Sequence, residues 1–158
     1  MDAVVVGIAD GKTVKHPGKL VTYALGSCVG ICLYDPLAKV AGMVHILLPY
    51  QKEAVNAKNS YKFADAGVLL LIREMEKMGA LRSRMTAKLA GGAEMFQYAG
   101  AGTKIGMRNV QAAKEALRQA GIKISAEDTG ENHGRTIWFS AETGELEVRR
   151  VGGRTMIL

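Results

Sequence analysis

The sequence predicts a mixed α/β protein of the α+β type: a single layered domain over residues 1–158, in which a mixed, mostly antiparallel β-sheet packs with two main helices. A chain of 158 residues with 48% hydrophobic residues can bury the core of one domain. Glycine is plentiful, at 19 residues, while aromatic residues make up only 6%, which is typical of a turn-rich protein with an aliphatic core. Short apolar runs are common, whereas helical periodicity is confined to two segments.

Short β-type runs separated by turn residues fill the amino-terminal part of the chain. A valine-rich run at 3–9 predicts the first strand, and Asp10-Gly11-Lys12 predicts a turn after it. His16-Pro17-Gly18 ends a short second segment, because proline and glycine interrupt strands. Three longer strands are predicted next, at residues 20–25, 29–34 and 40–48.

Two segments have the spacing of amphipathic helices. In residues 63–78, apolar side chains recur every three or four positions, and Gly79 is placed to end the helix. Asn109 is a suitable N-cap for a second helix over 110–120, since its short polar side chain can accept from the first free backbone N–H groups. These two helices are expected to cover the sheet.

The remaining segments complete the predicted sheet. Strands are expected at 85–90 and 122–127, and a hairpin is expected from 135–140 and 146–151. Residues 50–61 and 128–134 are polar and predict loops, while the glycine-rich stretch 95–103 is ambiguous.

The two cysteines indicate a reducing compartment. In an extended strand, Cys28 and Cys32 would be about 13 Å apart, too far for a disulfide. The amino terminus lacks the features of a signal peptide, and no apolar run is long enough for a membrane span. A cytoplasmic protein with two free thiols and no membrane insertion is therefore expected.

Charge and motif patterns disfavour several other classes of function. The net charge is +6, but the basic residues are scattered and no aromatic residues are interleaved with them, so a nucleic-acid partner is not expected. A basic surface could instead meet an acidic protein. The glycines of Gly100-Ala101-Gly102 and Gly106 fit neither a dinucleotide nor a Walker motif, and the histidines and cysteines lack zinc-ligand spacing. No cofactor and no metal are predicted.

The strongest candidate for chemistry is Cys28, which follows the small-residue turn Gly26-Ser27 at the edge of a strand. If the flanking strands form a hairpin about Leu37, opposed residue numbers sum to about 73 or 74, which places Cys28 opposite His45 or one residue from it. Directly opposed Cβ atoms are roughly 5 Å apart. A thiol beside an imidazole is suited to acyl transfer, and the histidine is expected to lower the thiol pKa.

Cys32 and His45 could also have purely structural roles. Cys32, in the middle of a strand, is expected to be a small buried hydrophobe. His45 taken alone could be a hydrogen-bonded core histidine. A third group is needed to orient the imidazole, and Thr22 on the preceding strand is one of several polar candidates.

Several motifs together resemble the CheD family of chemoreceptor glutamine deamidases. They cover nearly the whole chain in the order expected for that family, and their combination is far more specific than any single motif. The matching residues are Gly26-Ser27-Cys28, Asp35-Pro36 with Ala38-Lys39, His45-Ile46-Leu47-Leu48-Pro49, Lys88-Leu89-Ala90-Gly91-Gly92-Ala93, Ile105-Gly106 with Asn109, Asp128-Thr129-Gly130, and Gly134-Arg135.

The resemblance implies a protein-glutamine glutaminase in which Cys28 is the nucleophile, His45 the general base and Thr22 the orienting group. The substrates would be glutamine side chains on methyl-accepting chemotaxis receptors, and a CheC-type phosphatase would be a regulatory partner. The fold would resemble that of bacterial toxin deamidases. Weaker candidates for the oxyanion hole or for substrate binding are Gly26, Ser27, Gly91 and Gly92.

The chain departs from the family pattern at Glu131-Asn132-His133, where a second glycine is expected directly after Gly130. Two other functions remain as alternatives. One is a non-enzymatic adaptor that regulates a chemotaxis phosphatase. The other is a cysteine peptidase, since the same pair of side chains can attack a peptide bond.

Overall fold

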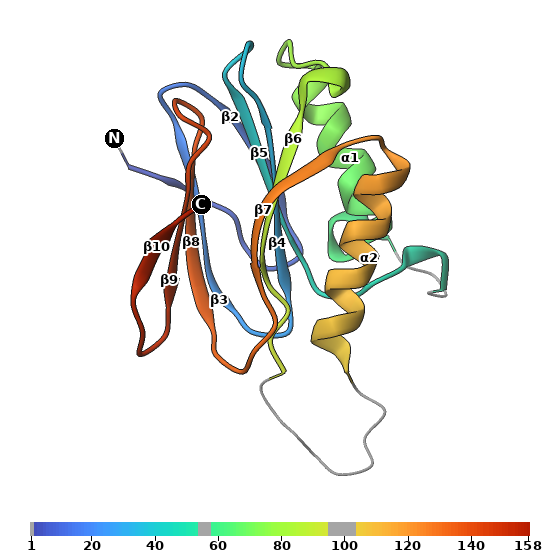
Figure 1. Ribbon diagram of the computed structural model, residues 1–158. Helices are drawn as coiled ribbons and strands as arrows, with labels where there is room; N and C mark the ends of the chain where they lie inside the picture. Colours follow the sequence, from blue (N-terminus) through green and yellow to red (C-terminus); the bar gives the residue numbers. More distant parts are fainter. Residues whose placement is uncertain (1, 54–57, 95–103) are drawn as a thin grey trace.

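The computed structural model describes residues 2–53, 58–94 and 104–158, which form three layers (Figure 1). Two five-stranded sheets pack face to face, and two helices cover the far side of one of them. We call the sheet between the other two layers the central sheet, with strand order β2-β5-β4-β6-β7, and the other the outer sheet, with order β1-β3-β8-β9-β10. Both ends of the chain lie on the side of the outer sheet (Figure 1).

The central sheet is buried on both faces. Its strands β4 and β5 have no exposed residue, which explains why their sequences are nearly continuous apolar runs. All neighbouring pairs are antiparallel except β6 and β7, which are parallel. The strands are β2 (Gly11–Lys15), β4 (Val29–Asp35), β5 (Val40–Ile46), β6 (Thr86–Gly91) and β7 (Lys123–Thr129).

The outer sheet packs one face on the central sheet and presents the other to solvent. Leu20, Phe139 and Val148 fill the layer between the sheets, whereas Tyr23 on the other face is 52% exposed. The pair β1–β3 is parallel and the other pairs are antiparallel. The strands are β1 (Val4–Val5), β3 (Lys19–Leu25), β8 (Arg135–Ser140), β9 (Leu146–Arg150) and β10 (Thr155–Ile157).

Helices α1 (Ala64–Glu76) and α2 (Ile105–Gln119) bury their apolar faces on the central sheet. Gly79 ends the first helical segment with φ +97°, and its N–H donates to the carbonyl of Glu76, so the predicted glycine cap is confirmed. Three short 3₁₀ segments complete the described secondary structure: η1 (Gln51–Glu53), η2 (Ser60–Lys62) and η3 (Arg82–Arg84).

The predicted class, a mixed and mostly antiparallel sheet structure with two main helices, is confirmed, and the strands divide between two sheets. The single strand predicted at 3–9 is wrong. Only β1 is a strand there, and its edge valines Val4 and Val5 are 39% and 46% exposed. The chain then crosses to the central sheet through Ala9, which has φ +58°. Gly11 and Lys12, which were expected to form a turn, instead begin β2.

The predicted N-cap role of Asn109 is also wrong. Helix α2 begins at Ile105, and Asn109 is fully buried within it. Lys104 occupies the N-cap position without a side-chain hydrogen bond. The ambiguous stretch 95–103, with its Gly100-Ala101-Gly102 motif, lies outside the described residues. The short strand β10 was not predicted, since its three residues carry almost no periodic signal.

Candidate active site

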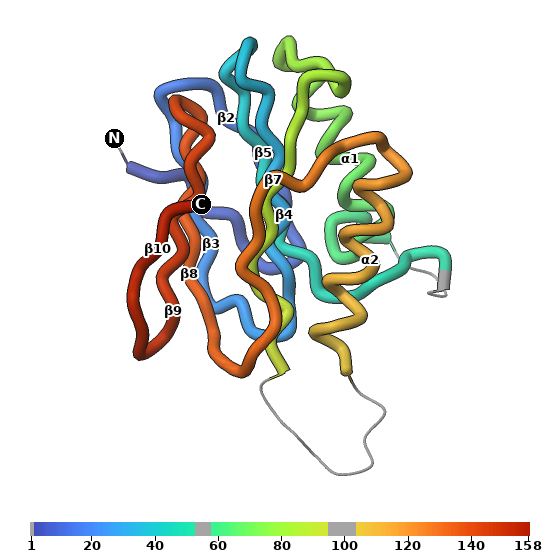
Figure 2. The backbone as a smooth tube through the Cα atoms, viewed as in Figure 1, coloured from blue at the N-terminus to red at the C-terminus, as the bar shows by residue number. Residues whose placement is uncertain are grey.

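The turn before Cys28 connects the outer sheet to the central sheet. It lies at the end of the molecule where β6 ends, α2 begins and β7 turns back into β8 (Figure 2). Ala24, with φ +57°, and a register shift between Thr22 and Leu25 let the chain leave the outer sheet. Cys28 is half-buried, Cys32 is fully buried, and both are free thiols.

Three consecutive carbonyl groups of this turn are held by donors from elsewhere. The carbonyl of Gly26 accepts from the N–H of Ala93 at 2.9 Å, and that of Cys28 accepts from the N–H of Gly92 at 2.8 Å. The carbonyl of Ser27 accepts from Nδ2 of Asn109, also at 2.9 Å. The turn is therefore fixed from three sides.

The glycines next to this turn allow the close approach of β6. A Cβ atom on Gly91 would lie 2.3 Å from the carbonyl oxygen of Cys28, and Gly91 has φ +111°. Gly92 has φ +68°, and its N–H is engaged with that same carbonyl. In this structure the two glycines support the turn through their backbone.

His45 lies on β5 and points into the layer between the two sheets. The observed β4–β5 register pairs residues whose numbers sum to 75, so His45 is opposite Gly30 and the predicted register is wrong. The hairpin is centred between Leu37 and Ala38 rather than on Leu37, since Asp35 pairs with Val40 across four connecting residues. Cys28 lies just before β4, two residues from Gly30, and packs against the core between the sheets, into which His45 points.

Thr22 and His45 form a buried hydrogen bond between the sheets. The Thr22 hydroxyl donates to the carbonyl of Val6 at 2.7 Å, which uses its only proton. The 2.8 Å contact between Oγ1 of Thr22 and Nδ1 of His45 must then be donated by the imidazole. The proton is thus on Nδ1, and Nε2 keeps a free lone pair. This Nε2 is buried and has no hydrogen-bond partner within the described ranges.

Burial keeps the His45 imidazole and the Cys28 thiol neutral in the resting protein. It lowers the pKa of His45 to about 4. It also raises the pKa of the Cys28 thiol, against a smaller opposite effect of the Cys28 backbone N–H. The expected lowering of the thiol pKa by His45 is therefore wrong for the resting state, since a neutral imidazole does not stabilise a thiolate. Within the described residues, no hydrogen bond joins the Cys28 thiol to Nε2 of His45.

A buried ion cluster supports the neighbouring loop and was not predicted from the sequence. Arg135 is fully buried, donates to Asp128 at 2.9 Å, and also reaches the carbonyls of Gly91 and Gly130. Its only sequence signal is a charge at the start of an apolar strand. Glu131 has φ +61°, the conformation that favours the glycine expected there, and its carboxylate lies 3.2 Å from Arg150.

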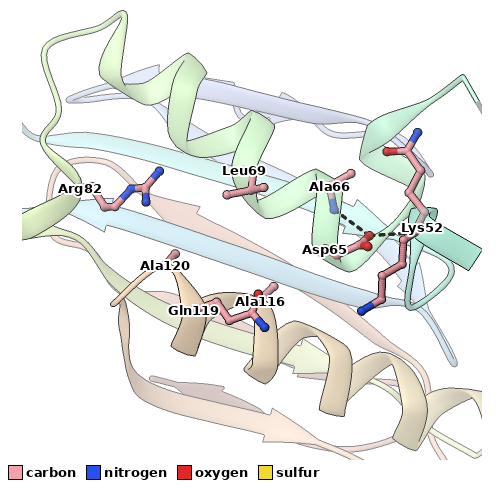
Figure 3. A pocket seen from close by; sticks show the side chains of 9 residues that line it. Lys52, Asp65, Ala66, Leu69, Arg82, Ala116, Gln119 and Ala120 are labelled. Carbon is pink, nitrogen blue, oxygen red and sulfur yellow. Dashed lines mark hydrogen bonds between the residues drawn. The ribbon is translucent and has the colours of Figure 1, made fainter.

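An open groove of about 540 Å³ lies elsewhere, between α1 and α2 (Figure 3). Leu69 and Ala116 face each other across it, with Lys52 and Arg82 farther along its rim. It is on the helix side of the central sheet, so none of the predicted site residues lines it. Residues 2–53, 58–94 and 104–158 contain no metal-binding cluster of His, Cys, Asp or Glu and no helix long and apolar enough to cross a membrane.

The comparisons with known proteins agree with the sequence motifs. A family model described as CheD chemotactic sensory transduction matches residues 47–150. A protein of Syntrophomonas wolfei, named probable chemoreceptor glutamine deamidase CheD, is 53% identical over 93% of this chain and 92% of its own. This chain belongs to the CheD family. The resemblance predicted from the motifs is thereby confirmed.

Other CheD proteins are similarly close. A Caldanaerobacter subterraneus protein named probable chemoreceptor glutamine deamidase CheD is 55% identical, covering 93% of this chain and 92% of its own. The chemoreceptor glutamine deamidase CheD of Thermotoga maritima is 47% identical, covering 94% and 92%. Among solved structures, protein NMB0706 of Neisseria meningitidis aligns with a TM-score of 0.49 at 10% identity, covering 81% of this chain and 64% of its own.

The two thiols should differ in reactivity. We expect iodoacetamide to alkylate Cys28 faster than Cys32 in the folded protein, because Cys32 is fully buried and its pKa is raised further. His45→Ala should slow Cys28 alkylation by about tenfold or more, since the base is lost. Mass spectrometry of timed digests measures both rates. Equal rates for the two cysteines, or no effect of His45→Ala, would contradict the pairing.

Proposed function

We propose that this CheD-family chain hydrolyses selected glutamine side chains of chemoreceptors to glutamate, with Cys28 as nucleophile, His45 as general base and Thr22 as orienting group. The observation that supports this most directly is the imidazole tautomer. The hydrogen bonds of Thr22 leave Nε2 of His45 as a free base in the core between the sheets, against which Cys28 packs. The names of the relatives supply the substrate class.

The reaction follows from these positions. His45 Nε2 takes the thiol proton as the Cys28 sulfur bonds to the amide carbon, and the carbonyl oxygen becomes an oxyanion. The imidazolium then gives its proton to the nitrogen, the C–N bond breaks, and ammonia leaves. Water, deprotonated by His45, attacks the thioester. The C–S bond breaks, glutamate forms, and the thiol recovers its proton.

We assign the oxyanion site to the backbone N–H groups of Ser27 and Cys28. The carbonyls of this turn all have donors, whereas these two N–H groups have no oxygen acceptor in the described part of the chain. The N–H of Cys28 belongs to the residue that carries the sulfur, next to which the oxyanion would form. Gly26 lets the turn bend, and Gly91 and Gly92 hold it.

A chemoreceptor cytoplasmic fragment distinguishes this function from its alternatives. After incubation with the purified protein, particular glutamines should be converted to glutamate while the fragment remains uncut, as peptide mass mapping would show. Cleavage that depends on Cys28 would indicate a peptidase. An unmodified fragment would favour the non-enzymatic adaptor.

The activity should persist to unusually low pH. Catalysis needs neutral His45, and because burial lowers its pKa to about 4, the neutral form is present above that value. We expect kcat/KM to hold as the pH falls below the ordinary histidine range and to be lost as it passes through about 4. Rates measured across pH, with circular dichroism to verify folding, test this. An acid limb near 6.5 would contradict it.

We further propose a cytoplasmic protein, consistent with two free thiols, and a CheC-type phosphatase as regulatory partner. If that partner covers the region around Cys28, an excess of it should inhibit deamidation, and Cys28→Ala should still bind it. Deamidation that is unchanged at a saturating partner concentration would rule out the shared surface.

A further inference from the structure

We propose that Asn109 is a positioning residue that sets the direction of the Cys28 N–H, the oxyanion donor of the proposed mechanism. This inference rests on the proposed function and names a further residue for it. The side chain is fully buried on α2, at the end of the helix nearest the β3–β4 turn (Figure 1).

Asn109 joins the two catalytic segments. Its Nδ2 donates to the carbonyl of Ser27 and to the carbonyl of Leu47, both at 2.9 Å. Ser27 immediately precedes the nucleophile, and Leu47 follows His45 by two residues. Because both partners are acceptors, they fix which side of the amide carries the nitrogen. One side chain therefore contacts both the segment that carries the thiol and the segment that carries the imidazole.

The contact to Ser27 also determines where the Cys28 N–H points. The Ser27 carbonyl and the Cys28 N–H belong to one peptide unit, and the only cis peptide bond in the described residues is His16–Pro17. In a trans peptide the C=O and N–H point in opposite directions. By drawing the carbonyl toward α2, Asn109 turns the Cys28 N–H away from the helix.

The asparagine makes two hydrogen bonds at the cost of one atom that is unpaired within the described residues. Its Oδ1 atom is buried and has no hydrogen-bond partner in the described part of the chain, which is unfavourable for a buried acceptor. An apolar side chain would avoid that cost but would remove the donor to the carbonyls of Ser27 and Leu47. It would also leave the Ser27 peptide free to rotate.

The test compares two reactions of the same thiol. Deamidation forms an oxyanion, whereas iodoacetamide is attacked at its CH₂ carbon with loss of iodide and forms none. For Asn109→Leu we expect the kcat on a chemoreceptor fragment to fall roughly 10²-fold, as for loss of one oxyanion donor. KM and the Cys28 alkylation rate should stay within roughly threefold of wild type, since binding and the thiol–imidazole pair remain. Asn109→Ser, which is too short to bridge both carbonyls, gives the same comparison if the leucine variant does not fold.

Tyr34→Phe is the matched control. The Tyr34 hydroxyl also donates to two backbone carbonyls, those of Ala141 and Glu142, but at the other end of β4. This variant should lose thermal stability while keeping kcat. A folded Asn109 variant with unchanged kcat would overturn the inference, as would alkylation that slows in parallel with kcat. Deamidation that survives Cys28→Ala would instead refute the proposed function itself.

Discussion

Replacing Cys28 by alanine should reduce deamidation of a chemoreceptor fragment by roughly 10³-fold or more, the scale of effect when a covalent nucleophile is removed. No other described thiol can substitute, because Cys32 is fully buried in the layer between the sheets. The fold should survive, since Cys28 is half-buried at the edge of the core and its carbonyl contacts are backbone ones. Product formation measured by mass spectrometry, with a thermal melt of the same sample, gives both quantities.

Cys32→Ala is the matched control for this experiment. It should cost about 1 kcal/mol of unfolding free energy through a small cavity, yet keep its turnover per folded molecule. Full activity of folded Cys28→Ala would eliminate the thiol mechanism. Loss of chemistry in folded Cys32→Ala would show that the wrong thiol had been assigned.

Thr22→Val should lower kcat/KM by roughly 10²-fold, less than the ~10⁴-fold caused by losing a carboxylate orienting group, because the threonine hydroxyl is neutral. Without the hydroxyl, Nδ1 of His45 loses its acceptor and the carbonyl of Val6 loses its donor. The imidazole can then place its proton on Nε2, where it cannot act as a base. Steady-state kinetics on the receptor fragment measure the effect.

Thr22→Ser separates orientation from packing. It removes the methyl group but keeps the hydroxyl, so kcat/KM should remain within roughly fivefold of wild type. Both substitutions should lower stability modestly, by about 1–2 kcal/mol, and the melting temperature checks that they are comparable. A serine variant as inactive as the valine variant would show that Thr22 acts through packing rather than through its hydrogen bonds.

The sequence was a good guide to local structure wherever one physical signal dominated. Continuous apolar runs identified β4 and β5 because both faces of these strands are buried. Periodicity and Gly79 defined the first helix. Asn109 was misassigned because a polar residue before an apolar face is typical of a helix start. Here it lies inside α2, where its buried side chain donates to the carbonyl of Ser27.

Local sequence predicted the candidate active site only in part. The hairpin brought Cys28 and His45 into proximity in the prediction, but its register was wrong because the centre of the turn was misplaced. Both side chains still lie on the side of the core between the sheets, since Cys28 packs against that core and His45 contacts Thr22 of the outer sheet. The contact from Thr22 crosses between sheets, and no strand spacing could have placed it.

The sequence by itself determined the family, the class of secondary structure and the residue types available for chemistry, because these depend on motifs and on periodicities within short segments. Tertiary structure alone decided that the strands form two sheets, that Thr22 fixes the proton of His45 on Nδ1, and that Asn109 holds the turn before Cys28. Each of these depends on hydrogen bonds between residues far apart in the chain. The partners of these hydrogen bonds are brought together by the packing of whole layers, which local sequence does not encode.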